Sequence, residues 1–133
     1  MMIEFEVSGK PQGKARPRFS RDGRVYTPSA TRAYEKRVRD AYRAAGGKML
    51  TGAIQLEIYA MFVIPASTTK KARQWLSEHN KYLKKPDADN IAKSVADGLN
   101  GVAYEDDAQV YSLHVIKTYQ DVSKIVVRVY GNA

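Results

Sequence analysis

The sequence contains no cysteine among its 133 residues. This absence excludes a disulfide scaffold, a zinc site built on thiolates and a cysteine nucleophile. No apolar run approaches the roughly 20 residues that a membrane-spanning helix needs, and residues 1–10 lack a signal-peptide core. The two histidines, His79 and His114, stand alone, so the sequence does not favour a metal site or triad built on histidine. We therefore expect a soluble cytoplasmic protein.

Length and composition suit one globular domain. A chain of 133 residues is too short for two ordinary domains. Its hydrophobic content of 44% supports a core, and its charged content of 27% does not resemble that of a disordered chain. No repeat or long linker divides it. We predict a single domain over residues 1–133.

The net charge of +8 is concentrated in one part of the chain. The segment from Lys10 to Arg43 holds 11 basic residues against three acidic ones, and the remainder is neutral. A basic segment of this kind is typical of a surface that binds a polyanion such as nucleic acid. A solvated basic helix that only aids solubility is the alternative.

Hydrophobic periodicity and turn signals predict an α+β fold, with a mixed sheet of about four strands and helices packed on it. Asp22-Gly23 favours a tight hairpin turn, Thr27-Pro28 a helix start and Gly46-Gly47 a helix end. We expect Trp75 to pack in a short helix and Tyr111 to lie in the core. The expected order is a strand at 2–8, a hairpin at 18–26, a helix at 28–45, a strand at 53–64, helices at 67–79 and 89–99, and strands at 108–119 and 124–130.

The densest chemical signal is a set of carboxylates around the helix at 89–99. Asp87 and Asp89 lie two residues apart just before this helix, and Asp106 and Asp107 lie at the entry of the next strand. Clustered carboxylate oxygens bind hard cations, and Mg²⁺ prefers few protein oxygens together with water and substrate phosphate. This pattern suits metal-assisted hydrolysis of a phosphodiester.

Helical spacing gives these residues a common face. Asp89, Lys93 and Asp97 follow one another at every fourth position, so they share one side of the helix. Lys93 is then placed to stabilise negative charge that develops on a phosphate. The opposite side carries the apolar stripe Ile91, Val95 and Leu99.

Structural interpretations of the same residues stay open at this point. The alternative interpretations are that Asp89 caps the helix, that Asp87 interacts with the positive end of the helix dipole, and that Lys93 belongs to a surface ion-pair network. Two other functions are therefore considered beside a nuclease. One is a DNA-binding module without catalysis, and the other is a hydrolase of small phosphoesters that uses paired Asp.

The motifs resemble one known family. The run Lys85-Pro-Asp-Ala-Asp-Asn90, with Lys93, Asp97 and Glu105-Asp-Asp107, resembles the RusA family of Holliday junction resolvases, which is frequent in phages and prophages. The segments 13–19 and 26–28 are similar to phage-type members. The resemblance covers about residues 9–110.

The resemblance implies a RusA-like fold and a homodimeric endonuclease that needs Mg²⁺, with Mn²⁺ as a possible substitute. Such enzymes cut four-way DNA junctions by paired symmetric nicks in recombination and repair. The family's catalytic and metal-binding carboxylates fall on Asp87, Asp89 and Asp107, and its helical lysine falls on Lys93. Asp106 is either an alternative ligand or a residue that supports the ligands without touching the metal, because adjacent residues on an extended chain face opposite ways. The chain departs from some members at Pro86, where they carry a basic residue, and at Tyr104, where they carry Trp.

The basic residues are expected to contact backbone phosphates of branched DNA. Contacts of this kind position a protein on DNA but carry little sequence information. The candidates lie in the loop after the first strand, on the first helix and just before the acidic run: Lys14, Arg16, Arg18, Arg32, Lys36, Lys84 and Lys85.

Overall fold

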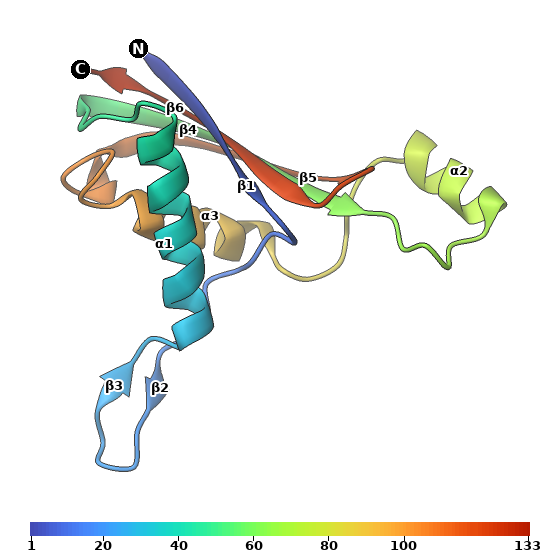
Figure 1. The fold of residues 1–133 in the computed structure, drawn as a ribbon, viewed down its shortest axis with the longest axis horizontal. Helices are drawn as coiled ribbons and strands as arrows, with labels where there is room; N and C mark the ends of the chain where they lie inside the picture. Colours follow the sequence, from blue (N-terminus) through green and yellow to red (C-terminus); the bar gives the residue numbers. More distant parts are fainter.

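A computed structural model describes all of residues 1–133 and shows a four-stranded sheet with two helices across one face (Figure 1). The strands lie in the order β1-β6-β4-β5, and only β4 and β5 run parallel. This confirms the predicted α+β class with a mixed sheet. The elements are β1 (Met2–Ser8), β2 (Arg18–Phe19), β3 (Val25–Tyr26), α1 (Ser29–Ala44), β4 (Thr51–Val63), α2 (Lys70–Glu78), α3 (Ala88–Leu99), the 3₁₀ turn η1 (Asp107–Gln109), β5 (Val110–Gln120) and β6 (Lys124–Asn132).

The core forms between the sheet and the helices α1 and α3. Alternate residues of β4 are buried from Ile54 to Phe62, as expected for a strand with one face toward the core. The two helices also contact each other at Gly98 of α3, where an added Cβ would lie 3.0 Å from the Glu35 carbonyl oxygen and 3.1 Å from the Val38 Cβ. The absence of a side chain at Gly98 therefore sets how closely α1 and α3 approach.

The ends of α1 follow the turn signals with one difference. The helix begins at Ser29 with Pro28 as the capping residue, so Thr27 does not cap it as the sequence had suggested. At the other end Gly46 adopts a positive φ of 84°, which glycine accepts without strain. The Gly47 amide donates to the Tyr42 carbonyl at 2.9 Å and closes the helix.

Helix α2 stands away from the sheet, and the packing predictions for Trp75 of α2 and for Tyr111 of β5 are both wrong. No residue of α2 is buried, and Trp75 is 57% exposed and stacks on His79 instead of entering the core. Figure 1 shows α2 projecting from the body at the end of the loop that follows β4. Tyr111, near the start of the edge strand β5, is likewise 72% exposed and does not enter the core.

The chain after α2 returns to the sheet through aromatic packing. Tyr82 stacks on Phe62 with a centroid separation of 3.6 Å, and its amide donates to the Lys117 carbonyl at 3.1 Å. The next residues lead directly into α3, so this contact fixes where α3 begins. No helix combines the length and the apolarity needed to cross a bilayer.

Candidate active site

A cavity of about 330 Å³ opens where α3 meets the start of β5. Three of the residues that line it carry charge: Asp89 and Lys93 come from α3, and Asp107 comes from η1. Residues far apart in the sequence are therefore brought to one cavity. Its remaining lining is mostly apolar, from Leu56, Ala92, Ala96, Val110, Tyr111 and Leu113.

Helix α3 presents its two faces as the spacing predicted. The apolar stripe is fully buried against the core, while Asp89 and Lys93 are exposed on the other side. Asp89 lies in the first turn, where a carboxylate also interacts favourably with the helix dipole. The packing of one face thus fixes the direction in which the acid and the base of the other face point.

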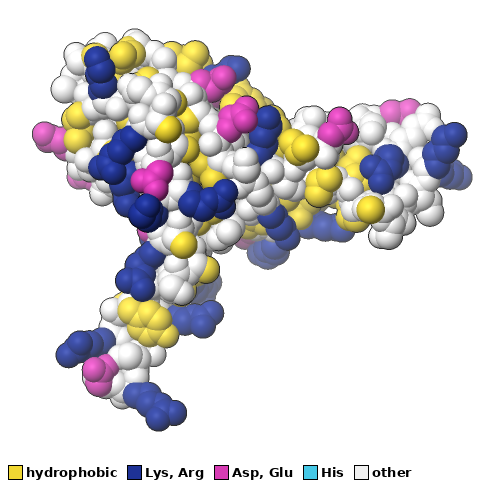
Figure 2. Space-filling model, viewed as in Figure 1, with side chains coloured by type: hydrophobic (Ala, Val, Ile, Leu, Met, Phe, Trp, Pro, Cys, Tyr) yellow, Lys and Arg dark blue, Asp and Glu magenta, His cyan; other side chains and the backbone are white.

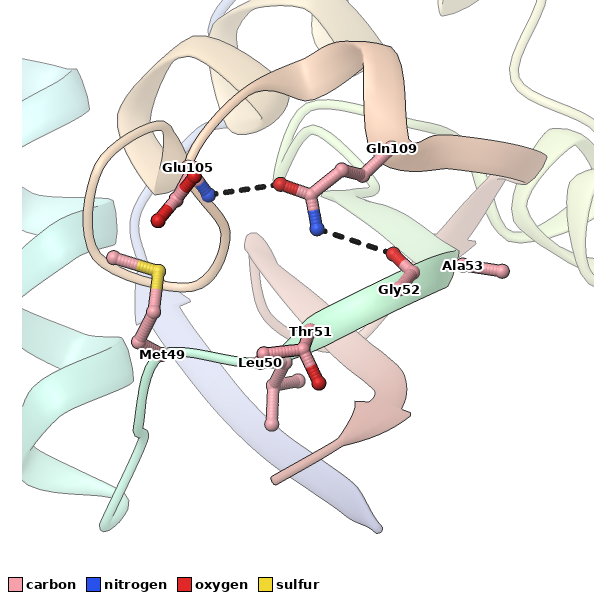
Figure 3. Close-up of a pocket in the computed structure, with 7 residues that line it drawn as sticks. All are labelled: Met49, Leu50, Thr51, Gly52, Ala53, Glu105 and Gln109. Carbon is pink, nitrogen blue, oxygen red and sulfur yellow. Dashed lines mark hydrogen bonds between the residues drawn. The ribbon is translucent and has the colours of Figure 1, made fainter.

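The loop that carries Asp107 is held by reciprocal hydrogen bonds. The Asp106 carboxylate accepts from the Ala108 amide at 3.3 Å, and the Gln109 side chain accepts from the amides of Asp106 at 3.2 Å and Glu105 at 3.0 Å. Gln109 also donates to the Gly52 carbonyl at 3.1 Å, as Figure 3 shows, which ties the loop to the start of β4. Asp106 therefore acts as a cap and leaves Asp107 at the cavity.

The environment of Asp107 favours its protonated form. A hydrogen bond with the Asp106 carboxyl, partial burial and the neighbouring negative charges of Asp106 and Asp97 raise the pKa of Asp107 above its ordinary value. The nearby Lys93 ammonium acts in the opposite direction and lowers it. Two adjacent carboxyl groups of this kind repel when both are ionised, and a cation relieves that repulsion.

A second ion-pair network lies on the same face of α3. The Lys14 ammonium lies 2.7 Å from a Glu35 oxygen and 3.0 Å from an Asp97 oxygen. The other Asp97 oxygen lies 3.5 Å from the Lys93 ammonium. Burial acts to lower the pKa of Lys14, but the hydrogen bonds to Glu35 and Asp97 outweigh it and the pKa is raised. Lys14 thus links the loop after β1 to α1 and α3.

Backbone contacts hold this loop against α3. The Lys14 amide donates to the Asn90 carbonyl at 3.0 Å, and the Ser94 hydroxyl donates to the Gln12 carbonyl at 2.8 Å. Gly13 fits closely here, since an added Cβ would lie 3.0 Å from the Asn90 Cβ. The loop is therefore fixed on the first half of α3, beside the candidate site.

Asp87 does not line the cavity. It occupies the capping position of α3 without making a side-chain capping bond, and its carboxylate pairs with Lys85 at 2.9 Å. The hydrogen bond from Lys85 lowers the pKa of Asp87, as do the charges of Lys85 and Lys117. The run of residues 84–86 is itself held by the Lys117 ammonium, which donates to the carbonyls of Lys84 at 2.7 Å and Pro86 at 2.8 Å.

The carboxylates that share the cavity fit a divalent metal by their chemistry, although no group of three Asp, Glu or His side chains lies close enough to hold one ion. Mg²⁺ is commonly held by one or two carboxylates and completes its shell with water and substrate phosphate. Asp89 and Asp107 supply hard oxygen ligands to one cavity, and Asp107 lies against a second carboxyl group. Two of the three predicted ligands therefore face the same space, and Asp87 lies outside it.

The predicted DNA contacts differ in their surroundings. Arg16, Arg18 and Arg32 are exposed, and Lys36 is exposed but pairs with Asp40 at 2.7 Å. Lys84 is also exposed, and it lines another cavity, between β4 and the loop after α2. Lys14 and Lys85 are engaged with carboxylates, as described above. Figure 2 shows Lys and Arg side chains spread over the β2–β3 hairpin, α1 and α2.

Comparison with known proteins identifies the family. The family model for the endodeoxyribonuclease RusA matches residues 8–130, which is nearly the whole chain. The chain belongs to the RusA endodeoxyribonuclease family. It is also similar to the uncharacterized protein YqaN of Bacillus subtilis strain 168, with 30% identity over 134 residues that cover 96% of this chain and 94% of YqaN.

Membership of the RusA family makes the chain an enzyme of the crossover junction endodeoxyribonuclease class. Nucleases of this family are metal-dependent, and membership implies a branched DNA substrate and resolvase-type activity. The predicted family resemblance is thereby confirmed. The assignment of individual residues as ligands or DNA contacts stays a prediction.

Sequence reasoning missed two residues that shape this RusA-type site. Gln109 lies three residues after Asp106, which is the spacing of a capping box, so this signal was present in the sequence. Lys117 lies in the middle of a strand and gave no such signal. Its role depends on the loop at 84–86 passing beside β5, which only the folded structure reveals.

Proposed function

We propose that this protein is a Mg²⁺-dependent endonuclease that resolves four-way DNA junctions by paired symmetric nicks in DNA recombination and repair. The observation that supports this most strongly is the shared cavity of Asp89, Lys93 and Asp107 in a chain of the RusA family. Carboxylates and a lysine at one cavity are what metal-assisted cleavage of a phosphodiester requires.

Each charged residue has a distinct role in this proposal. Asp89 and Asp107 would hold the metal, and Lys93 would stabilise negative charge that develops on the phosphate oxygens. The chemistry that Mg²⁺ supplies in such a site is polarisation of the phosphate and a lowered pKa for water. The Asp107 carboxyl must be ionised to bind a cation, and Lys93 favours that form.

Asp87 can join the proposed ligand set only after its carboxylate exchanges Lys85 for the metal. Its carboxylate is paired with Lys85, and the side chains are exposed by 48% and 84% respectively. An ion pair this exposed contributes little stability, so the carboxylate can leave it at small cost. A metal ion that attracts the Asp87 carboxylate, or a phosphate that attracts the Lys85 ammonium, would favour this exchange.

Selectivity for a branched substrate would come from shape, since phosphate contacts carry little sequence information. In a symmetric homodimer two basic surfaces and two cavities are related by a twofold axis, which matches symmetric nicks in opposite strands. The homodimer is a prediction from the family resemblance. Light scattering on the purified protein tests it, and a monomer mass at working concentration would contradict it.

The direct test is cleavage of a synthetic four-way junction beside a linear duplex of the same length, with and without Mg²⁺. The proposal predicts paired nicks in the junction only with Mg²⁺, and little cutting of the duplex. Junction binding without cleavage in Mg²⁺ or Mn²⁺ would favour a DNA-binding module. Release of phosphate from a nucleotide, with both DNAs intact, would favour a hydrolase of small phosphoesters.

The variant Asp87→Asn tests the third ligand separately. It should abolish nicking and leave binding of the junction unchanged, because Asn keeps the size of the side chain and removes its charge. Asp121→Asn, in the exposed turn after β5, is the matched control and should cut normally. Full activity of Asp87→Asn would remove Asp87 from the ligand set and leave Asp89 and Asp107.

A further inference from the structure

The β2–β3 hairpin is an exposed arm that leaves the body of the protein next to the start of α1 (Figure 1). It is a short two-stranded sheet, with Arg18 opposite Tyr26 and Phe19 opposite Val25. Its base is fixed by a hydrogen bond from the Ala15 amide to the Thr31 hydroxyl at 3.3 Å. A two-stranded ribbon of this size is marginally stable alone, so a binding partner would add to its order.

The arm is basic along its whole length. It carries Arg18, Arg21 and Arg24 against a single acid, Asp22. Asp22 lies 3.2 Å from the Arg24 guanidinium and also bonds to the Ser20 hydroxyl, so its charge is locally neutralised. Arg18 and Arg21 form no ion pair and are exposed. Their charge is therefore available to a polyanion.

The arm also exposes apolar surface that the body does not cover. Phe19 is 75% exposed, and Val25 opposite it is 62% exposed. Residues directly opposite in an antiparallel pair share a face of the ribbon, so these two side chains form one apolar patch. Tyr26 is 46% exposed on the other face, beside Arg18. Phe19 and Arg18 thus point to opposite faces of a thin ribbon, and an exposed ring on a ribbon that also carries arginines fits an unstacked nucleotide, whose base stacks on the ring and whose phosphate meets a cation.

We propose that the β2–β3 hairpin is a nucleotide-binding arm, in which Phe19 stacks on a base that is unpaired or unstacked at the branch point of DNA while Arg18 and Arg21 contact the flanking phosphates. This inference rests on the proposed function. Bases inside a linear duplex are already stacked on their neighbours and offer no free face to Phe19. The arm would therefore favour branched DNA over duplex, which backbone contacts alone do not do.

Charge argues against a second copy of the chain as the partner of this patch. In a symmetric dimer built on the arms, the arginines of one copy would face those of the other, and like charges across an interface weaken binding. The chain as a whole carries a net charge of +8. A nucleic acid supplies the opposite charge and a planar apolar face at once.

The test measures dissociation constants by fluorescence anisotropy, without divalent metal, for a four-way junction and a linear duplex of equal length. Phe19→Ala is expected to weaken junction binding about tenfold, equivalent to about 1.4 kcal/mol, and to leave duplex binding within about twofold. Phe19→Trp keeps an aromatic ring at this position and should bind the junction about as tightly as the wild type. Val122→Ala, which shortens another exposed apolar side chain, is the control and should change neither constant.

A second readout reports stacking directly. With 2-aminopurine at the branch point, wild type and Phe19→Trp should change its fluorescence on binding, and Phe19→Ala should change it much less. Arg18→Ala should weaken binding of both DNAs, because it removes a phosphate contact.

Three results would overturn the inference. In the first, Phe19→Ala binds the junction as tightly as Val122→Ala does. In the second, Phe19→Ala weakens binding of the junction and of the duplex equally. In the third, Phe19→Ala changes the oligomeric mass of the protein. In each case junction cleavage by the wild type would leave the proposed function standing. Failure of the wild type to cut any junction would instead remove the proposed function itself.

Discussion

Replacement of Lys14 by methionine is expected to destabilise the folded protein by about 2 kcal/mol. The Lys14 side chain is 20% exposed and lies between Glu35 and Asp97, which are 13% and 22% exposed. Methionine retains the apolar stem and removes the charge, so two partly buried carboxylates lose their common cation. An exposed ion pair contributes about 0–1 kcal/mol, and breaking a fully buried one costs about 3–5 kcal/mol. The exposure of this triad lies between these limits.

Urea denaturation, followed by circular dichroism, measures the loss, and the thermal midpoint should fall by about 8 °C for a chain of this size. Lys36→Met is the matched control, because Lys36 pairs with Asp40 on the exposed side of α1, and this variant should leave the stability nearly unchanged. Adding Glu35→Gln to Lys14→Met should recover part of the stability. Equal effects of the two lysine variants would refute the structural role given to Lys14.

Three further outcomes follow from the packing and the charge distribution. Gly98→Ala should destabilise the fold by about 1–2 kcal/mol in urea, since the steric cost of a Cβ at the contact of α1 and α3 outweighs the better helix propensity of alanine. Unchanged stability would contradict the close approach of the two helices. Trp75→Ala should change stability by less than about 0.5 kcal/mol, and a larger loss would show that Trp75 packs against the body. The double variant Arg16→Glu, Arg18→Glu should reduce the slope of log affinity against log salt by about 2, whereas an unchanged slope would move the phosphate contacts elsewhere.

Elements defined by local patterns were predictable from the sequence. The alternation of β4, the presence of a hairpin and the glycines after α1 each depend on a few neighbouring residues, so their physics is visible in the sequence itself. The hairpin turn differs in detail from the expected two-residue turn at Asp22-Gly23, because only Gly23 has a positive φ and the turn is centred on Arg21 and Asp22. The two faces of α3 were also predictable, because helical periodicity assigns Asp89 and Lys93 to the side opposite the core.

Features that depend on distant contacts were not predictable. The amphipathic pattern of α2 indicates an apolar side but not whether the body reaches it, and Trp75 is exposed because the helix stands off the sheet. Counting charges along the chain predicted Lys14 as a phosphate contact. The fold gives it two carboxylate partners, because the loop after β1 crosses α3.

The candidate site was only partly predictable, because it too depends on contacts between distant parts of the chain. The acidic motifs identified the right segments, and the fold brings Asp89 and Asp107 to one cavity. The spacing of Asp87 and Asp89 could not reveal that Lys85 draws the first carboxylate away, since this depends on how the loop at 84–86 is held by Lys117.

The central claim is that Asp89 and Asp107 act as one unit on a phosphodiester, and the cleavage rates of Asp89→Asn, Asp107→Asn and the double variant test it most directly. With a four-way junction and saturating Mg²⁺, each single variant should lose nearly all activity, and the double variant should lose no more, because residues that act together are strongly non-additive. Asp106→Asn, which retains a capping oxygen, should keep cutting. Single variants that still cut at near wild-type rate, or small losses that multiply in the double variant, would contradict a shared site.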